Sequence, residues 1–275
     1  MMIKGGIRIG GLGIAGYDAD AAAYFDRAGV TDTAAKIQIN AFVKGMKNLS
    51  LYNDMVCWPL RSSQNKGSGT TAYSLGGLGT YDGTLINGPT WGTDGVNFVT
   101  GSVTRIESST VPFSNSLSVF NVSSHTAFGA PSGDHSATAV INPSYQISGQ
   151  DSFINGSSGA RNLYFWIYRA GGVASELVVS ITDDAVFLNS FHAYGVSASS
   201  SNNATIYDGT ATTLTTSTPV IGSSQVVMGF SSIASRPMTG KIPFHLVSSV
   251  GFSASQYSSL YTLYKTTLGT GLGLP

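Results

Sequence analysis

The first residues whose spacing could support chemistry lie near the start of the chain. Gly11, Gly13 and Gly16 form a complete G-x-G-x-x-G motif, and Asp32 follows about twenty residues later. In a dinucleotide-binding βαβ unit such glycines let the backbone approach a pyrophosphate, and a later carboxylate binds the ribose. The motif raises the hypothesis of a nicotinamide- or flavin-dependent enzyme.

The elements expected around the motif argue against that hypothesis. A dinucleotide fold alternates strands and helices, whereas here one helical stretch is followed by a second and then by β patterns. Asp32 stands at a helix start, where N-capping explains it, and a chance match is easy among 34 glycines. We predict no cofactor and interpret residues 1–16 as an extended arm that lies against another chain through Ile7, Arg8, Ile9, Leu12 and Ile14.

The carboxylates form no obvious catalytic pair. Glycosidic-bond hydrolysis requires two carboxylates flanking the bond, but Glu107 and Glu176 are the only glutamates and are far apart in the sequence. Asp183 and Asp184 are adjacent, so on a strand they would face opposite ways, and a turn accounts for them better. We expect that the protein is not an enzyme.

The four histidines show no metal-binding pattern. His125, His135, His192 and His245 have neither i,i+4 nor H-x-H spacing. The stretch PSGDHS places His135 beside an aspartate and a serine, but neighbours in sequence seldom assemble a triad. No metal ligand set can be named from the sequence.

The densest aromatic stretch is NLYFWIYRA, residues 162–170. On a strand, Tyr164, Trp166 and Tyr168 share one face, with Arg169 nearby, while the alternate apolar residues share the other face. Three coverings of the first face are open: a helix of the same chain, a neighbouring protein, or a glycan. We expect packing against protein, from this chain or a neighbour.

Two helices are predicted ahead of the β region. Asp18 is the expected N-cap of a helix that Gly29 ends, and a second helix begins near Thr31 or Asp32. Apolar residues at helical spacing form one stripe along the second helix: Ile39, Phe42, Val43, Met46 and Leu49. This stripe indicates packing on a neighbouring layer.

From about residue 55 short alternating runs are separated by turn residues, which favours an antiparallel sandwich or jelly roll. At the end of the chain Ser253 and Gln256 form a capping box, and Gly269 is expected to end the helix. One face of this helix carries Tyr257, Leu260, Tyr261, Tyr264 and Leu268.

The composition limits the class of partner. Only 10% of residues are charged, against about 25% in an ordinary soluble domain, and the formal net charge is zero. Attraction to nucleic acid or an anionic membrane is therefore not expected. The single cysteine, Cys57, allows no intrachain disulfide and lies among apolar neighbours, which predicts burial. We expect neither a transmembrane segment nor a signal peptide.

Three motifs between residues 58 and 98 carry a family resemblance: GSGTT at 67–71, DGTLINGPTW at 82–91 and GVNF at 95–98. They resemble the opening of the concanavalin A-like, laminin-G-like superfamily. NATIYDGTATTLTTST, the closing strand and the last helix extend the similarity over residues 56–269. Within it, Asn87-Gly88-Pro89 predicts a turn, and Trp91 is interpreted as a core residue rather than a sugar platform. The N-terminal helical sequence and the ending YKTTLG are similar to the variant in virion proteins of tailed bacteriophages.

The resemblance implies a mainly β, concanavalin A-like antiparallel sandwich (jelly roll) in three parts: an arm (1–16), a helical anchoring segment (17–54) and the sandwich with its C-terminal helix (55–275). It implies a non-enzymatic virion structural protein of a bacteriophage, in a decoration, fibre or tail appendage. The expected partners are copies of the chain, other virion proteins and host-surface polysaccharide. The alternative is a secreted lectin that binds carbohydrate with calcium held by loop Asp and Asn residues, although no ligand set is identifiable.

Overall fold

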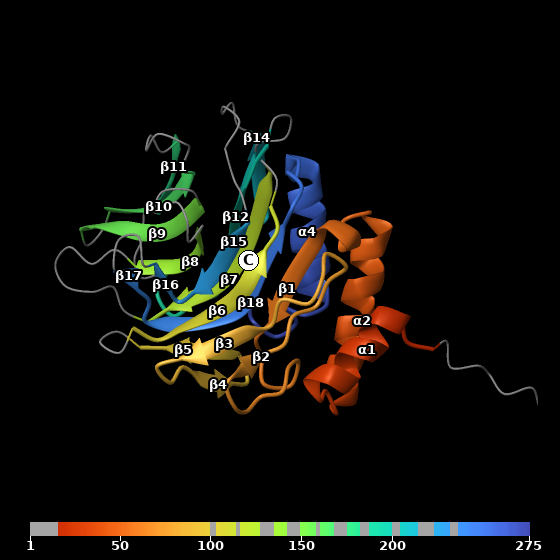
Figure 1. Cartoon of the computed structure of the whole chain (residues 1–275). Helices are drawn as coiled ribbons and strands as arrows, with labels where there is room; N and C mark the ends of the chain where they lie inside the picture. Colours follow the sequence, from red (N-terminus) through yellow and green to blue (C-terminus); the bar gives the residue numbers. More distant parts are fainter. Residues whose placement is uncertain are drawn as a thin grey trace, which may run out of the picture.

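The computed structural model describes residues 16–99, 103–113, 116–126, 135–141, 149–157, 160–167, 175–181, 187–199, 204–213, 223–231 and 236–275. These residues form two large antiparallel sheets, two N-terminal helices and a C-terminal helix (Figure 1). The predicted mainly β antiparallel sandwich with its flanking helices is confirmed. No helix in the described ranges is both long and apolar enough to span a bilayer.

The two N-terminal helices begin where their capping residues predict. Helix α1 (Ala19–Ala28) is capped by Asp18, whose carboxylate accepts a hydrogen bond from the Asp20 amide at 3.0 Å. Gly29 ends it in the left-handed conformation, with φ 65°. Helix α2 (Thr33–Asn48) is capped by Asp32, which accepts from the Ala35 amide at 2.7 Å. Asp32 therefore has the capping role expected of it.

One sheet, called here the central sheet, has the order β14-β13-β12-β7-β18-β5-β4, with β1 also paired to β18. A short 3-10 helix, η1 (Tyr52–Asp54), leads into it. Its strands are β1 (Met55–Pro59), β4 (Thr90–Gly92), β5 (Gly95–Phe98), β7 (Leu117–His125), β12 (His192–Ala198), β13 (Ala204–Tyr207), β14 (Thr210–Thr213) and β18 (Gly240–Ser248).

The second sheet, called here the outer sheet, has the order β11-β10-β9-β8-β15-β6-β3-β2. Its strands are β2 (Thr71–Ala72), β3 (Gly83–Ile86), β6 (Arg105–Val111), β8 (His135–Ile141), β9 (Gly149–Ser157), β10 (Ala160–Ile167), β11 (Ser175–Ile181) and β15 (Ser224–Met228). Strands β16 (Phe230–Ser231) and β17 (Arg236–Pro237) form a separate two-stranded sheet. All pairs between named strands are antiparallel, so the described chain contains no parallel dinucleotide-binding sheet.

The Asn-Gly turn after β3 has an unexpected place in this topology. Asn87 and Gly88 adopt positive φ values of 60° and 79°, as a tight turn requires. The strands that it joins belong to different sheets, so the turn makes a corner of the sandwich and closes no hairpin. Trp91, on edge strand β4, is only half-buried and donates from Nε1 to the Gly69 carbonyl at 3.0 Å. Trp91 packs against the edge of the cluster between the sheets, so the predicted core position is corrected to a partly buried one at the rim.

The middle strands of the central sheet are buried on both faces because helices cover one face and the outer sheet covers the other. All nine residues of β7 are buried. Phe120 and Val122 belong to the hydrophobic cluster that includes the helices. Val119 belongs to the cluster between the two sheets, which also contains Trp58 and Phe98. Such a strand is buried throughout and lacks the alternation of a half-exposed strand.

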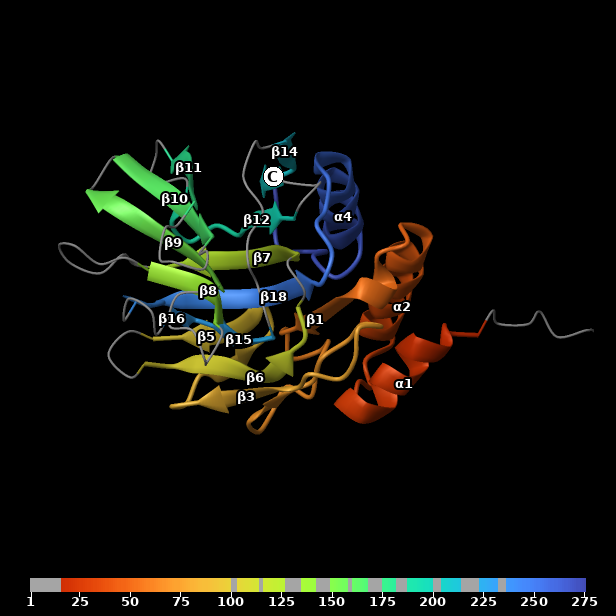
Figure 2. The same cartoon turned by 45° about the horizontal axis from the view of Figure 1, so that its top comes forward.

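The helices and the central sheet share one hydrophobic cluster. Four stripe residues of α2 are fully buried in it, namely Ile39, Phe42, Val43 and Met46, and Leu49 packs at its edge. The predicted packing stripe is confirmed. Figure 2 shows α1, α2 and α4 together on one side of the molecule, with β9 and β10 on the opposite side.

The C-terminal helix α4 (Ala254–Thr266) begins with the predicted capping box between Ser253 and Gln256. All members of its predicted apolar face are buried: Tyr257, Leu260, Tyr261, Tyr264 and Leu268. The helix ends at Thr266 and not at Gly269, because Thr267 leaves the helical region at φ −120° and ψ −97°. The Gly269 amide then donates back to the Tyr264 carbonyl at 2.8 Å.

We expect Leu260→Ala to lower the free energy of unfolding by about 2–5 kcal/mol, since the side chain is fully buried and its loss leaves a cavity. Denaturant unfolding measures this change. Thr262→Ala on the exposed side of the same helix is the matched control and should change stability little. A Leu260→Ala effect as small as that of the control would contradict the docking of α4 on the central sheet.

Candidate functional site

Part of the predicted interaction surface lies outside the described residues. This applies to the arm residues Ile7, Arg8, Ile9, Leu12 and Ile14, to Tyr168 and Arg169, and to Asp183 and Asp184. Tyr164 and Trp166 lie on β10, whose backbone position and register are defined. The structure therefore places only the β10 part of the aromatic stretch, and it places that part in the outer sheet.

Strand register shows which face of β10 turns toward the sandwich core. Val226 and Met228 of β15 are fully buried in the cluster between the sheets. Residues paired directly across antiparallel strands lie on the same face of a sheet. From Met228 the pairing runs through β8 and β9 to Phe165, and from Val226 it runs likewise to Ile167. Phe165 and Ile167 therefore occupy positions on the core-facing side.

Tyr164 and Trp166 occupy the alternate positions of β10 and so belong to the opposite face. Register joins Trp166 to Asp151 on β9 and to Glu176 on β11, and it joins Tyr164 to Phe153 on β9. We call these five positions the aromatic face: Asp151, Phe153, Tyr164, Trp166 and Glu176.

The helices of the described chain do not cover the aromatic face. Helix α4 packs against β13, β14 and α2, and the buried residues of α1 and α2 cluster with the central sheet. Both views place the three helices on one side and β9–β11 on the other (Figures 1 and 2). Among the described elements, β16 and β17 contact the neighbouring strand β8 of this sheet, so the covering of the aromatic face stays open.

The two glutamates are not brought together by the fold. Glu107 lies on β6 and its carboxylate pairs with Arg105 at 2.5 Å. Glu176 lies on β11, with β15, β8, β9 and β10 between the two strands. This arrangement excludes Glu107 and Glu176 as the acid–base pair of a glycosidase, which requires carboxylates about 5–10 Å apart.

A buried histidine–aspartate pair was not found by sequence reasoning. His192 Nδ1 lies 2.6 Å from Asp208 Oδ2, and the other oxygen of Asp208 accepts from the Ala193 amide at 2.9 Å. The imidazole is stacked between Phe187 and Tyr207, at centroid distances of 4.4 and 5.8 Å. His192 Nε2 has no hydrogen-bond partner in the described part of the chain, so no nucleophile is placed for it to activate. The pair braces the β12–β13 hairpin.

Two other buried groups that could react, the His245 imidazole and the Cys57 thiol, are held in their neutral forms by burial. His245 stacks on Trp58, contacts Asn121 Oδ1 at 3.2 Å, and has its pKa lowered to about 3 by burial, so it stays neutral at physiological pH. Burial raises the pKa of the Cys57 thiol, which confirms its predicted place in the core and leaves it protonated. Within the described ranges, no three His, Cys, Asp or Glu side chains are close enough to hold a metal ion.

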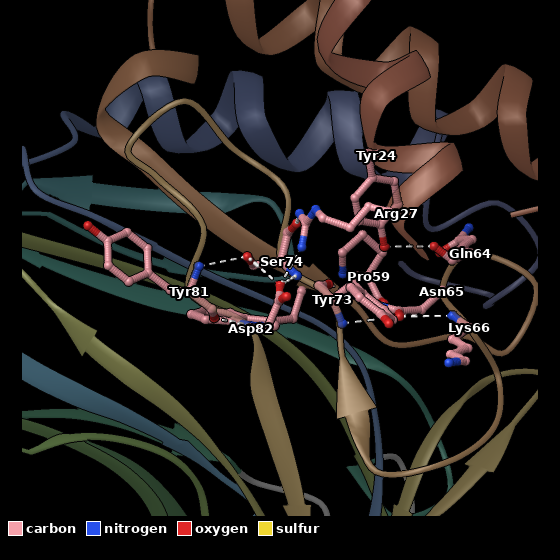
Figure 3. A network of polar contacts seen from close by, with 11 residues as sticks. Tyr24, Arg27, Pro59, Gln64, Asn65, Lys66, Tyr73, Ser74, Tyr81 and Asp82 are labelled. Carbon is pink, nitrogen blue, oxygen red and sulfur yellow. Dashed lines mark hydrogen bonds and ion pairs between the residues drawn. The ribbon is translucent and has the colours of Figure 1, made fainter. Parts of the chain in front are cut away.

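The motif residue Asp82 holds a loop and helix α1 together (Figure 3). Its Oδ1 accepts from the Ser74 amide at 2.8 Å and from the Ser74 hydroxyl at 3.0 Å. Arg27 of α1 donates to the same oxygen at 2.6 Å and also to the Ser74 carbonyl. The Ser74 hydroxyl in turn accepts from the Tyr81 amide at 2.9 Å. These bonds assign a structural role to Asp82.

A second set of bonds fixes the loop that follows β1 (Figure 3). The Tyr24 hydroxyl donates to the Gln64 carbonyl at 2.9 Å, and Gln64 Nε2 donates to the Leu268 carbonyl at 2.8 Å. Asn65 is buried and donates to the carbonyls of Pro59 and Tyr73, at 2.8 and 2.9 Å. These bonds hold α1, the loop after β1 and the C-terminal segment together.

The described chain is an antiparallel sandwich of the jelly-roll kind with helices on one side. Similar solved structures include the botulinum neurotoxin serotype D binding domain, with a TM-score of 0.55 and 11% identity over 78% of this chain and 52% of that chain. The serotype G binding domain gives 0.51 and 12% over 78% and 51%. The receptor binding domain of a mosaic serotype C/D neurotoxin gives 0.54 and 10% over 77% and 51%.

The chain thus spans about half the length of the neurotoxin structures that it matches. At these identities the similarity establishes the fold alone. No protein-family model matches the sequence, and no curated protein matches it significantly.

Proposed function

We propose that this chain is a non-enzymatic adhesive structural protein of a bacteriophage particle, in a decoration, fibre or tail appendage. The observation that carries the proposal is the separation of two surfaces on opposite sides of the sandwich. Helices α1, α2 and α4 lie on one side, and strands β9–β11 lie on the other (Figure 2). The proposal assigns attachment to the helical side and display to the side of β9–β11.

Three further observations support the proposal. The solved structures with the same fold are named as binding or receptor binding domains. The N-terminal helical sequence and the ending YKTTLG resemble virion proteins of tailed phages. A surface poor in charge and rich in Gly, Ser and Thr suits a long-lived particle exposed outside the cell. The partners proposed are other virion proteins, copies of this chain and host-surface polysaccharide.

We expect deletion of residues 1–16 to leave thermal stability unchanged and to abolish incorporation into particles. A Gly-rich segment buries little apolar surface within its own domain, so its removal should cost the sandwich little stability. Thermal unfolding of the truncated chain and its presence in purified particles, detected with an antibody, measure the two effects. Arg8→Ala in the full-length chain is a milder companion variant.

The outcomes separate the two functions considered. Normal incorporation of the truncated chain would remove the anchoring role of the arm. Absence of the full-length chain from particles, together with calcium-dependent carbohydrate binding by a soluble monomer, would overturn the proposal in favour of a secreted lectin. No cofactor is proposed for the virion function, whereas the lectin alternative would use calcium, for which the sequence identifies no ligand set.

A further inference from the structure

We infer that a groove between helices α2 and α4 binds residues 9–15 of a second copy of this chain, so that neighbouring copies are joined by their arms. The inference rests on the proposed attachment role of the arm and names what the arm binds. The groove has a volume of about 540 Å³. Helix α2 lines it with Gly45, Asn48 and Leu49, and α4 lines it with residues that include Ser258, Ser259 and Leu263.

A close contact between the two helices creates an apolar floor in this groove. A Cβ on Gly45 would lie only 2.4 Å from Leu263 Cδ1, so a glycine is needed where α4 approaches α2. Leu49 and Leu263 are half-buried and pack against the edge of the cluster shared by the helices and the central sheet. Asn48 and Ser259 are exposed at the rim. The groove is thus apolar at its base and polar at its edge.

The rim offers hydrogen-bonding groups that the described chain does not use. No hydrogen bond joins the side chains of Asn48, Ser258 and Ser259 to any residue in the described ranges. The Thr262 and Thr266 hydroxyls donate to the carbonyls of Ser258 and Thr262 at 3.0 and 2.8 Å, which leaves their oxygens as acceptors. An extended peptide needs partners for its backbone amides and carbonyls. The groove therefore supplies both the donors and the acceptors that a bound segment requires.

Residues 9–15 of the arm have a composition that suits this groove. The segment IGGLGIA carries no charge, and no charged residue is among the described residues that line the groove. From Ser258 to Thr266 helix α4 rises about 12 Å, a length that roughly four extended residues span. Alternate side chains of an extended segment share one face, and Leu12 and Ile14 form such a pair. The neighbouring glycines allow the backbone to lie close to the floor.

The position at which the chain enters α1 favours the arm of a second copy. The Asp18 amide donates to Asn40 Oδ1 at 2.7 Å, and Lys47 Nζ donates to Asp18 at 2.7 Å, so the arm begins where α1 meets α2. Both views show α2 between α1 and α4 (Figures 1 and 2). The chain's own arm would have to cross the exposed side of α2, which carries Ile37. Each copy has one arm and one groove, so exchange between copies uses both.

Sedimentation equilibrium of the full-length chain over a range of concentrations tests the inference. We expect dimers or larger species from the full-length chain and monomers from the chain lacking residues 1–16. Ser259→Trp fills the groove from its exposed rim and should raise the dissociation constant about tenfold or more, as loss of an interface anchor does. Ala23→Trp, on the exposed surface of α1, is the matched control and should associate as the unmodified chain does.

Two arm variants decide the question if circular dichroism shows that Ser259→Trp does not fold. Leu12→Asp and Ile14→Asp change no residue of the described fold, and each should weaken association as strongly as Ser259→Trp. A mixing experiment then tests complementarity. The Ser259→Trp chain has an arm but no open groove, and the chain lacking residues 1–16 has a groove but no arm. We expect these two chains to form a one-to-one complex although neither associates alone.

Disulfide trapping identifies which copy supplies the arm. A chain with both Leu12→Cys and Ser259→Cys should form covalent dimers under mild oxidation, because the native Cys57 thiol is buried and does not compete. A disulfide within one chain would overturn the inference in favour of the chain's own arm. A full-length chain that is monomeric at every concentration would also overturn it. So would association that is unchanged by Ser259→Trp and by both arm variants.

All of these measurements use purified protein without particles. A full-length chain that is found in particles but stays monomeric in solution would contradict the inference and leave the proposed function intact. A chain that exchanges arms in solution but is absent from particles would contradict the proposed function instead. Failure of the inference is thus distinguishable from failure of the proposed function.

Discussion

A chain lacking residues 1–54 is expected not to fold. Helices α1 and α2 contribute six large buried side chains to the cluster shared with the central sheet: Tyr24, Phe25, Ile39, Phe42, Val43 and Met46. Burying side chains of this size contributes about 1.5–3 kcal/mol each. Their combined loss is therefore on the order of 10 kcal/mol, comparable with the whole stability of a typical domain. Deletion would also expose Phe120 and Phe244 on the central sheet.

Soluble yield, circular dichroism and thermal unfolding measure this effect. The chain lacking only residues 1–16 is the control and should unfold cooperatively like the full-length protein. Supplying residues 17–54 as a separate polypeptide should restore folding at least in part. A soluble 55–275 fragment with a sharp unfolding transition would show instead that the helical segment is a dispensable module, as the predicted division at residue 54 implies.

Gly195→Ala is expected to destabilise the central sheet strongly. A Cβ at this position would lie 2.2 Å from the Val119 carbonyl oxygen and 3.2 Å from Tyr257 Cε1. Gly195 pairs with Phe120 on β7 and with Ile206 on β13, so the obstructing atom belongs to the backbone of the neighbouring strand and cannot rotate away. We expect a loss of about 3 kcal/mol in unfolding free energy, the upper end of typical overpacking costs.

Denaturant unfolding measures this loss, with Gly69→Ala as the control. Gly69 has φ 72° and open space around the added methyl, so its replacement should cost only about 1 kcal/mol for the left-handed conformation. Equal effects of the two variants would show that β7 and β12 can separate to accept the methyl group.

Features set by neighbouring residues could be predicted from the sequence. The caps at Asp18, Asp32 and Ser253 depend on side chains within three residues of the amides they bind, and each is found in place. Strands such as β6 and β9 could not be predicted in this way, because RIESSTV and GQDSFINGS are polar and lack clear alternation. Their pairing partners across the sheet define them as strands, and local propensity does not report such partners.

The candidate site likewise has one feature that the sequence predicts and others that it does not. The period of two along β10 predicts that Tyr164 and Trp166 share a face, and the register is consistent with that alternation. The presence of Asp151 and Glu176 beside Trp166 depends on how three strands align, and a shift of one residue would place them on the other face. The pairing of His192 with Asp208 likewise depends on the β12–β13 register, which brings together residues with no sequence pattern in common.

The pairing of β1 with β18 has a consequence for biosynthesis. The Ser248 hydroxyl donates to the Asp54 carbonyl from 194 residues further along the chain, and β18 is also the neighbour of β7 and β5. During translation β1 emerges early and can bridge to Leu75, but its partner strand in the central sheet appears only when residues 240–248 leave the ribosome. Domains complete folding as units, and unpaired strand edges promote aggregation while they wait. A nascent chain that stalls before residue 240 lacks β18, so β1 and β7 each still lack a neighbouring strand. Such a chain is therefore expected to need a chaperone.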